Sequence, residues 1–430
     1  MLLKNKKINR KIVDNKEHIK SSVFLFFINV SNFIFPLFLS PIIISRCGVE
    51  GFGVVTMFQS IMLFISSITE YGFNINGTRE VTINQNNKEY INRYFFTVSY
   101  AKSLLFIIAL FLVLLVYFFF HKANEYSLVF ITSFAMLLGR AYNPLWILRA
   151  IHKMKFIFYF YVLFKILSIL AVYIFLKKTE DLFLVNLSIG LSDLLTCVFA
   201  TMVLVINLNW KHIFPSIAEI KAEIYSGASI FVQVLSVNAN TYFNPVILGF
   251  FVDSYSLGIY CVVEKIILTI KFCAAFILQS VFPKACELSI DNKMMFNQFM
   301  KSLQIFLIIV MITMAFGLIS FSDYITSYFI KTNIEACSDL LIYCAWIPLV
   351  VGLNMSPYLT FMVYKIQKPV TYVIVLSVIL NVILNTILSK KFGIYGVSTG
   401  IYITELFNCI SLWLLMIFIY PKINFLKNEK

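Results

Sequence analysis

The feature that most constrains this chain is a series of long apolar runs separated by short clusters of charged residues. A helix needs about 20 mostly apolar residues to cross a bilayer, and reading for runs of that length gives twelve segments. Only helices and closed barrels satisfy their backbone in lipid, and these runs are too long for the roughly ten-residue alternating strands of a barrel. The sequence therefore predicts an all-α integral membrane protein with 12 transmembrane helices. The predicted spans are 21–45, 52–73, 94–120, 126–148, 156–176, 182–206, 228–251, 256–283, 302–330, 338–364, 369–389 and 394–420.

The distribution of basic residues predicts the orientation of the chain. A composition of 60% hydrophobic and 13% charged residues excludes a water-soluble globule, yet the net charge is +14. Of the 35 lysines and arginines, 23 fall in the two tails and in every second connection, whereas seven fall in the alternate connections. Because cytoplasmic loops are enriched in these residues, we expect both termini in the cytoplasm. The excess charge thus indicates topology and does not indicate a nucleic-acid partner.

The sequence also repeats at a spacing near half its length. Six helices in each half give the two halves the same orientation, which predicts a parallel repeat of two six-helix lobes related by a pseudo-two-fold axis along the membrane normal. Transporters built in this way carry substrate between their lobes. A duplicated scaffold without a transport role is the alternative. The recurring residues are Pro144 and Pro357, Lys155 and Lys368, Asp193 and Glu405, and Gly53 and Gly258, at offsets of 213, 213, 212 and 205. The predicted regions are a cytoplasmic basic tail 1–20, an N-terminal lobe 21–206, a cytoplasmic interlobe linker 207–227, a C-terminal lobe 228–420 and a cytoplasmic tail 421–430.

No residue pattern in the sequence indicates an enzyme. No glycine is followed by lysine, which excludes the phosphate-binding loop of ATP-driven transporters, and the zinc-protease and serine-hydrolase motifs are absent as well. The eight cysteines contain no C-x-x-C pair, so we expect neither a metal site nor a disulfide framework. We therefore predict no catalytic residues and no cofactor. A membrane polysaccharide polymerase is the alternative from the enzyme class, and it predicts a long outer loop that we do not find.

Charged residues inside the predicted spans are the candidates for function. Each costs about 2.5–3.5 kcal/mol at the bilayer centre on insertion scales. We interpret Lys265 and Lys271 as lining a hydrated cationic cavity, with Glu264 in the same long apolar segment. The basic residues in the spans are Lys102, Arg140, Lys165, Lys265 and Lys271, and the acidic ones are Glu70, Asp193, Glu264, Asp323 and Glu405.

The structural interpretation of these positions differs by residue. Lys102 and Lys165 are expected to extend toward a membrane interface. Asp193 and Glu405 occupy equivalent positions in the two halves, which favours a structural feature of the repeat over two ion-coupling sites. Asparagines in the spans, among them Asn385, are expected to bond neighbouring helices, and bonding of sugar hydroxyls is the alternative. Three further residues lie near span ends, which suits interfacial side chains: Glu70, Arg140 and Asp323.

Short motifs follow one another in a specific order along nearly the whole chain. The first group is Pro36-Leu37, Pro41, Arg46-Cys47-Gly48-Val49-Glu50-Gly51-Phe52-Gly53, Glu70-Tyr71-Gly72-Phe73-Asn74 and Thr78-Arg79-Glu80. The later group is Pro144-Leu145-Trp146, Lys153-Met154-Lys155, Gly227-Ala228-Ser229, Asn244-Pro245-Val246-Ile247-Leu248-Gly249, Gly258-Ile259-Tyr260, Glu264-Lys265, Pro283, Phe392-Gly393, Gly396-Val397 and Thr404-Glu405-Leu406. In their order and spacing these motifs resemble the bacterial O-antigen and capsular polysaccharide flippases, commonly called Wzx. The chain departs from that pattern at Arg46-Cys47, where a hydrophobic residue commonly precedes the glycine, and at Leu148-Arg149-Ala150-Ile151, where a Gln-Gly pair is frequent.

The resemblance implies a MATE-like fold, that of the multidrug/oligosaccharidyl-lipid/polysaccharide exporters, with two six-helix lobes around a central cavity. It implies a flippase that moves an undecaprenyl-pyrophosphate-linked oligosaccharide from the inner to the outer leaflet of the bacterial cytoplasmic (inner) membrane by alternating access. The product would feed O-antigen or capsular polysaccharide synthesis, with a polymerase and chain-length machinery as partners beside the membrane lipids. A related exporter of drugs or other small organic cations is the alternative, and its cavity should be acidic and aromatic.

The chemistry of this cargo sets the expected site. Lipid excludes the charged pyrophosphate, so a flippase needs a hydrated cationic groove while the polyprenyl tail stays in the bilayer. We expect the groove to be lined by Arg140, Lys265 and Lys271, with Arg46 at its outer mouth and Arg79 at its inner mouth. A helix-end anchor is the alternative role for Arg79. A gradient of H⁺ or Na⁺ would drive the cycle through three candidate acids, Glu70, Asp193 and Glu264.

Overall fold

The described part of the chain is helical throughout. In a computed structural model, the backbone is described for residues 2–85, 87–208 and 212–426, and the side chains from residue 24 onward within these ranges, except at 29, 33, 207 and 208. Within these ranges there is no strand, so the all-α class predicted from the sequence is confirmed. The side chains of the predicted basic tail 1–20 lie outside the described residues. The same is true of the side chains of Asn29, Lys211, Lys427 and Lys430.

The chain divides into two compact units, and each is described by itself. The first unit comprises Met1–Cys47 and Phe58–Asn238, and the second comprises Gly48–Met57 and Ala239–Lys430. Two helices contribute to both units, namely α1 (Leu2–Glu70) and α9 (Ile217–Phe251). The predicted linker 207–227 therefore contains the first turns of α9, and the lobe boundaries stay a prediction.

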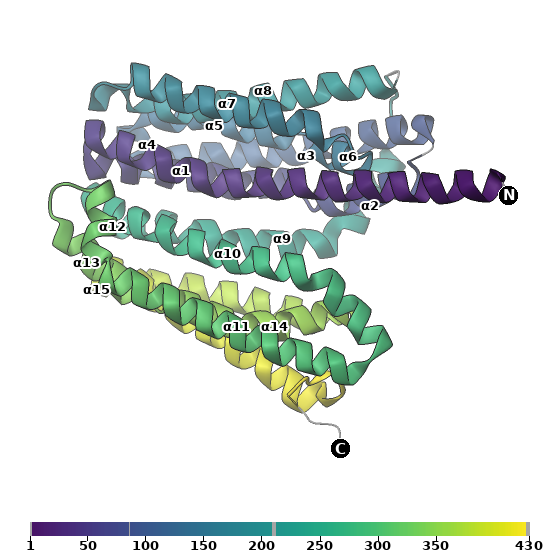
Figure 1. Cartoon of the computed structure of the whole chain (residues 1–430). Coiled ribbons are helices and arrows are strands. Elements are labelled where there is room, and N and C mark those ends of the chain that lie inside the picture. Colours follow the sequence, from purple (N-terminus) through teal and green to yellow (C-terminus); the bar gives the residue numbers. More distant parts are fainter. Residues whose placement is uncertain (1, 86, 209–211, 427–430) are drawn as a thin grey trace. The chain divides into compact units, whose positions relative to one another are not determined.

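The first unit otherwise contains α2 (Phe73–Ile83), α3 (Lys88–Phe119), α4 (His121–Glu125), α5 (Ser127–Ala141), α6 (Leu145–Ala150), α7 (Met154–Phe175), the 3₁₀ turn η1 (Thr179–Leu182) and α8 (Phe183–Leu208). The second contains α10 (Ser254–Asp291), α11 (Lys293–Ser320), α12 (Ser322–Phe329), α13 (Ile334–Cys344), α14 (Ile347–Val363), α15 (Gln367–Leu414), η2 (Leu415–Ile419) and η3 (Pro421–Ile423). Helix α8 packs against α5 and α7 in the first unit, and α14 packs against α10, α11 and α15 in the second (Figure 1).

Eight segments of the described chain are long and apolar enough to cross a membrane. Two of them are interrupted by a glycine with positive φ, Gly48 (φ 72°) and Gly393 (φ 56°), where the helical hydrogen-bonding direction is broken. Glycine populates this region without the steric cost of a Cβ. The predicted spans 228–251 and 256–283 correspond to α9 and α10, which are outside the eight. The eight segments are Phe24–Ile83, Lys88–Phe119, Ser127–Ala150, Met154–Phe175, Thr179–Ile206, Lys293–Ser320, Ile334–Val363 and Gln367–Ile419.

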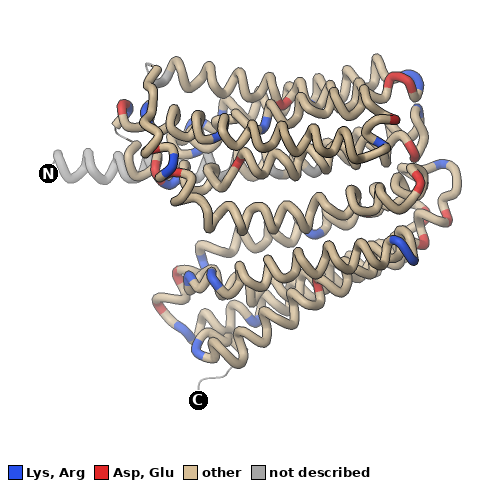
Figure 2. Tube along the Cα trace, turned by 180° about the vertical axis from the view of Figure 1, so that it is seen from behind, with Lys and Arg blue, Asp and Glu red and all other residues tan. Residues whose placement is uncertain are grey.

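Helix α3 shows how these helices suit a lipid environment. Its exposed face carries large apolar side chains three or four residues apart, whereas its buried face carries smaller ones and a lysine. A helix of a soluble protein has the reverse arrangement, with its polar residues outside. The exposed residues are Ile107, Phe111, Leu114 and Phe118, and the buried ones are Lys102, Leu105, Ala109 and Val113. In Figure 2 the charged residues gather at helix ends and connections, and few lie along the helices. Both observations support a membrane protein.

In the second unit, two glycines bring helices into backbone contact. A Cβ added to Gly53 would lie 2.6 Å from the backbone nitrogen of Gly258, and one added to Gly258 would overlap the carbonyl oxygen of Val49. Small residues allow this close approach, which is a common way for membrane helices to associate. The two glycines are also a pair that recurs in the predicted repeat, at an offset of 205.

This contact predicts a difference between two glycine-to-alanine substitutions. Gly258→Ala should lower stability by about 1–3 kcal/mol, because the new methyl group must displace backbone. Gly317→Ala on α11 is the control, because a Cβ there meets nothing within 4 Å. That substitution should be neutral or stabilise the helix by up to about 1 kcal/mol. Thermal unfolding of the two purified variants in detergent tests this, and equal unfolding temperatures would contradict the close contact.

Candidate functional site

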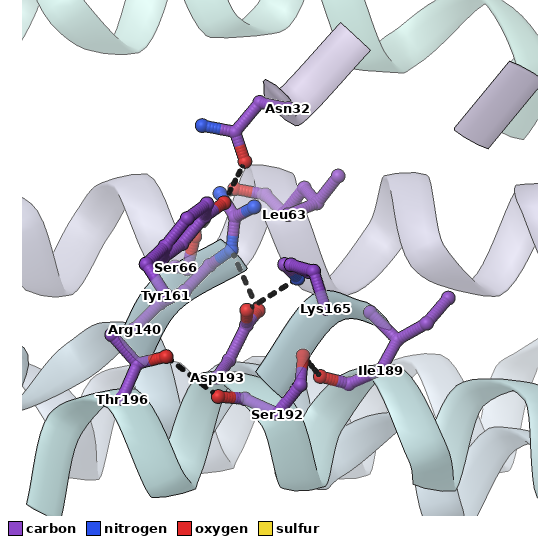
Figure 3. Close-up of polar contacts among 10 residues, drawn as sticks. All are labelled: Asn32, Leu63, Ser66, Arg140, Tyr161, Lys165, Ile189, Ser192, Asp193 and Thr196. Atoms are coloured by element: carbon purple, nitrogen blue, oxygen red, sulfur yellow. Dashed lines mark hydrogen bonds and ion pairs between the residues drawn. The ribbon is translucent and has the colours of Figure 1, made fainter. Parts of the chain in front are cut away.

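Three charged side chains from three helices meet inside the first unit. Figure 3 shows Asp193 of α8 between Arg140 of α5 and Lys165 of α7. The Lys165 Nζ lies 2.7 Å from Asp193 Oδ1, and the Arg140 Nε lies 3.4 Å from Asp193 Oδ2. The Lys165 and Asp193 side chains are 10% and 8% exposed, and that of Arg140 is 31% exposed. The expectation that Lys165 extends to an interface is therefore wrong, because an acid on the neighbouring helix holds its ammonium group inside the protein.

Glycines allow the helices that carry these charges to approach one another. A Cβ at Gly139, next to Arg140, would lie 2.7 Å from the backbone carbon of Asp193. A Cβ at Gly190 would lie 2.6 Å from the Cβ of Ala135. Helices α5 and α8 therefore pack backbone against backbone, which brings the guanidinium group within reach of the carboxylate.

A second set of contacts holds the α7 side of this cluster. The Tyr161 hydroxyl donates a hydrogen bond to Asn32 Oδ1 on α1, as Figure 3 shows. The Lys165 Nζ lies 5.7 Å from the centre of the Tyr161 ring, within the range of a cation–π contact. Lys102 is also buried, at 3% exposure, and it interacts electrostatically with Glu70. The expected interfacial position of Lys102 is therefore wrong as well.

A cavity of about 160 Å³ opens beside the charged cluster. Its charged lining residues are Glu70, Arg140, Arg149 and Asp193, and its amide side chains are Asn32, Asn74 and Asn143. The structure thus brings together three predicted residues, Glu70, Arg140 and Asp193. Asn74 Nδ2 donates to Glu70 Oε2 at 3.3 Å. The volume suffices for a few water molecules or a phosphate-sized anion, since a water occupies about 30 Å³ in the liquid.

Arg149 is the least satisfied group in this cavity. Its Nε is buried and has no hydrogen-bond partner among the described residues. A buried guanidinium nitrogen without an acceptor is costly, and a carboxylate, phosphate or water acceptor would relieve that cost. The sequence contained one signal for this residue, because it lies where the chain departs from the Gln-Gly pair of the family it resembles.

A larger cavity of about 480 Å³ lies between α2, α3 and the first turns of α9. Arg93 Nε lies 2.8 Å from Glu219 Oε1, and the Tyr94 hydroxyl donates to Glu223 Oε1 at 2.6 Å. Arg79, predicted at the inner mouth, lines this cavity.

Two acids of this cavity lie ahead of the predicted span 228–251 and have shifted pKa values. Hydrogen bonds from Arg93 and from Ser216 lower the pKa of Glu219 from 4.5 to about 2. Burial raises the pKa of Glu223, and the nearby charge of Glu80 adds to that rise. Ser216 and Glu219 also bond each other's backbone nitrogen, at 3.2 and 2.7 Å, which caps the start of α9. The pair Arg93–Glu219 therefore connects α3 to a capped helix start.

The sequence of this chain is similar to those of known proteins. The sequence pattern of the family described as polysaccharide biosynthesis protein matches residues 19–289, more than half of the chain. The chain belongs to that family. Two relatives named for O-antigen transport, from Escherichia coli strain K12 and Shigella dysenteriae, are 21% and 26% identical over 275 and 283 residues. These alignments cover 64% and 63% of this chain, and 66% and 67% of the relatives. The match thus spans just under two thirds of the first relative.

Solved structures share the fold of this family member. The lipid II flippase MurJ in an inward closed conformation has a TM-score of 0.71 at 19% identity, covering 95% of this chain and 89% of that one. An inward-facing multidrug resistance MATE family transporter of the MOP superfamily has a TM-score of 0.67 at 14% identity, covering 92% and 95%. The MATE-like fold expected from the sequence is confirmed.

Arg46 and Lys271 have partners outside these cavities. The Arg46 guanidinium donates to the carbonyl oxygens of Tyr173 and Leu176, so it caps the end of α7 and satisfies carbonyl groups that the helix leaves free. In the second unit, Lys271 Nζ lies 2.6 Å from Glu405 Oε1. The role of Arg46 and Lys271 in a groove stays a prediction.

Lys265 and Glu264 lie in different surroundings. Lys265 is half-buried and forms no ion pair with a described residue. Glu264 is buried and accepts a hydrogen bond from the Tyr260 hydroxyl at 3.1 Å. The expectation that asparagines join helices is confirmed, because Asn385 Nδ2 donates to Asn244 Oδ1 at 2.8 Å between α15 and α9. Sequence analysis named both Asp193 and Lys165 but did not predict that they pair.

The charged cluster predicts a ranking of three substitutions. Asp193→Asn should destabilise by about 3–5 kcal/mol, because it leaves the buried Lys165 charge without its partner. Arg140→Gln should cost less, because Arg140 is partly exposed and Lys165 still neutralises the acid. Glu287→Gln is the control, because its pair with Lys284 is exposed and such pairs contribute about 0–1 kcal/mol. Thermal unfolding in detergent ranks the three, and an Asp193→Asn effect no larger than the control would contradict the buried pair.

Proposed function

We propose that this protein is a flippase for an undecaprenyl-pyrophosphate-linked oligosaccharide, which it moves from the cytoplasmic to the outer leaflet of the bacterial inner membrane. The observation that carries the proposal is the cavity of about 160 Å³ with Arg140 and Arg149 in its lining. Two guanidinium groups, one with an unsatisfied buried nitrogen, suit a pyrophosphate, because arginine forms paired, charge-assisted hydrogen bonds with phosphate oxygens. Family membership and the relatives named for O-antigen transport support the same cargo.

The proposed topology puts this cavity at the leaflet where such a cargo is made. Both termini are cytoplasmic, since 23 of the 35 basic residues lie in the tails and alternate connections. Glu70 and Arg149 lie at the cytoplasmic ends of their helices in this topology. A headgroup assembled in the cytoplasm would therefore meet the cavity directly, while its polyprenyl chain stays in lipid.

Transport would follow alternating access between two six-helix lobes, 21–206 and 228–420, with twelve spans in total. The breaks at Gly48 and Gly393 support counting the two longest apolar segments as two spans each. Among the acids, Glu70 suits coupling to H⁺ or Na⁺ best, because it lines the cavity, accepts a hydrogen bond from the Asn74 amide and forms no ion pair with a described residue. Asp193 is already bound by two cations, and Glu264 by a tyrosine hydroxyl.

The charged lining consists of two arginines and two acids, and the arginines argue against the related exporters of organic cations. A cation would be repelled by Arg140 and Arg149, and the two acids of this cavity are bound to other groups or lie beside an amide. An anionic cargo does not meet this difficulty. The polysaccharide would then be completed by a polymerase and chain-length proteins.

The cavity predicts a strong effect of a neutral substitution at Arg149. Arg149→Gln should weaken cargo binding by about tenfold or more, because a hydrogen bond to a charged group contributes about 1.5–3 kcal/mol. Flipping of a fluorescent lipid-linked oligosaccharide in proteoliposomes measures the loss, with protein amounts matched. Lys284→Gln, which changes an exposed cation, is the control. Unchanged flipping by Arg149→Gln would contradict the proposed pyrophosphate site.

The role of Lys271 can be separated from its pairing with Glu405. Neutralising Lys265 and Lys271 together should abolish surface polysaccharide while the protein stays in the membrane, if both lysines line the groove. In Lys271→Gln with Glu405→Gln, the ion pair is removed without leaving an unpaired charge. If this double variant makes a normal amount of surface polysaccharide, Lys271 neutralises Glu405 and does not bind cargo. Quantitative display of polysaccharide, with immunoblotting for expression, reads out both variants.

A further inference from the structure

The larger cavity of the first unit has a chemistry different from that of the smaller one. At about 480 Å³ it lies within the usual range of small-molecule sites, about 300–1,000 Å³. Its walls combine three carboxylates, two guanidinium groups, an amide and two tyrosine rings. The lining residues that matter below are Asn76, Arg79, Glu80, Tyr90, Tyr94 and Glu223.

Trp146 separates the two cavities. Its side chain lines the smaller cavity, and its ring packs edge-on against Tyr94 of the larger cavity with centroids 5.8 Å apart. Gly77 of α2 packs directly on the Trp146 ring, because a Cβ there would lie 2.6 Å from it. Helix α2 therefore contributes Asn74 to one cavity and Asn76 to the other. The two cavities therefore lie on either side of α2 and the Trp146 ring.

Some polar groups of the larger cavity already have a structural task. Arg93 is bound to Glu219, and Tyr94 is bound to Glu223, so these pairs join α3 to α9. Arg79, by contrast, forms no ion pair with any residue in the described ranges, and the Asn76 side chain no hydrogen bond. Among the described residues, the Glu80 carboxylate accepts one long hydrogen bond, in which the Tyr90 hydroxyl lies 3.5 Å from Glu80 Oε2. Asn76, Arg79 and Glu80 are the groups left to contact a ligand.

These groups match hydroxyl-rich ligands better than charged ones. A sugar hydroxyl both donates and accepts, so it needs carboxylate acceptors such as Glu80 and donors such as Arg79 and Asn76 side by side. A phosphate only accepts at neutral pH, and the carboxylates of Glu80 and Glu223 would repel it. An organic cation would meet the carboxylates of Glu80 and Glu223 but would leave the donors of Arg79 and Asn76 without an acceptor. A ring face such as that of Tyr90, stacked 6.0 Å from Tyr94, offers a rigid amphipathic surface for the apolar face of a pyranose.

The geometry points to a carbohydrate subsite in this larger cavity, formed by Asn76, Arg79, Glu80 and Tyr90, which holds sugar of the lipid-linked oligosaccharide. The smaller cavity across Trp146 holds the pyrophosphate of the same molecule. This inference rests on the proposed function, because the cargo supplies both the sugar and the anion. It adds that the protein recognises the oligosaccharide itself and not only the carrier lipid.

The test compares two lipids on the purified full chain in nanodiscs. One is the lipid-linked oligosaccharide extracted from the cells that make it, and the other is undecaprenyl pyrophosphate without sugar. The wild type should bind the sugar-bearing lipid about tenfold more tightly than the bare one. Glu80→Gln with Tyr90→Leu should lose this preference and bind the bare lipid as before. Glu80→Gln alone, a change of nearly equal shape, should lose part of it.

Matched controls and contrary outcomes keep the two proposals apart. Glu287→Gln with Tyr324→Leu changes an exposed acid and an exposed tyrosine elsewhere, and it should keep the preference. The subsite is overturned if the Glu80 and Tyr90 variants retain the full preference or weaken both lipids equally. If the wild type binds the released oligosaccharide through Glu80 and Tyr90 but neither lipid, the proposed flippase function fails while the subsite stands. Binding of bare lipid without any preference overturns the subsite and leaves the flippase function in place.

Discussion

The neutralisation of Lys165 by Asp193 is the interaction on which the first unit depends. A lone charge in an apolar interior costs far more than a helix contact returns, so the three helices that supply Arg140, Lys165 and Asp193 must remain together. Gly139 and Gly190 make that possible, because they let α5 and α8 meet without intervening side chains. The cavity beside the cluster is lined by Arg140 and Asp193 themselves.

Features that depend on the residues of a single helix could be predicted from the sequence. Length and hydropathy act along one helix, so the apolar runs were enough to predict an all-α membrane protein. The breaks at Gly48 and Gly393 also fall between predicted spans. Both glycines have positive φ, a backbone conformation that few other residues adopt. The number of spans and the lobe boundaries stay predictions, because the described units are defined by contacts rather than by sequence position.

Pairing between helices could not be predicted, because it depends on the rotation of one helix against another. Equal numbers of acids and bases in the spans indicated that pairs were available, but not that Lys165 would meet Asp193 or Lys271 would meet Glu405. Arg46 and Arg79 were grouped as two mouths of one groove, yet one caps a helix and the other lines a cavity. Arg149 entered the sequence analysis only as a departure from the family pattern, and its buried Nε without an acceptor among the described residues makes it a ligand-binding candidate.

Asp193 and Glu405 also bear on the repeat predicted from the sequence. They occupy equivalent positions in that repeat, but at the repeat offsets Lys165 corresponds to Val378 and Lys271 to Ser66. The lysine that pairs with each acid therefore has no counterpart at the corresponding position of the other half. A chimaera made from two copies of the first half would carry no counterpart of Lys271, and one made from two second halves would carry none of Lys165. Each acid and its lysine lie in the same half, so each half carries its own complete ion pair.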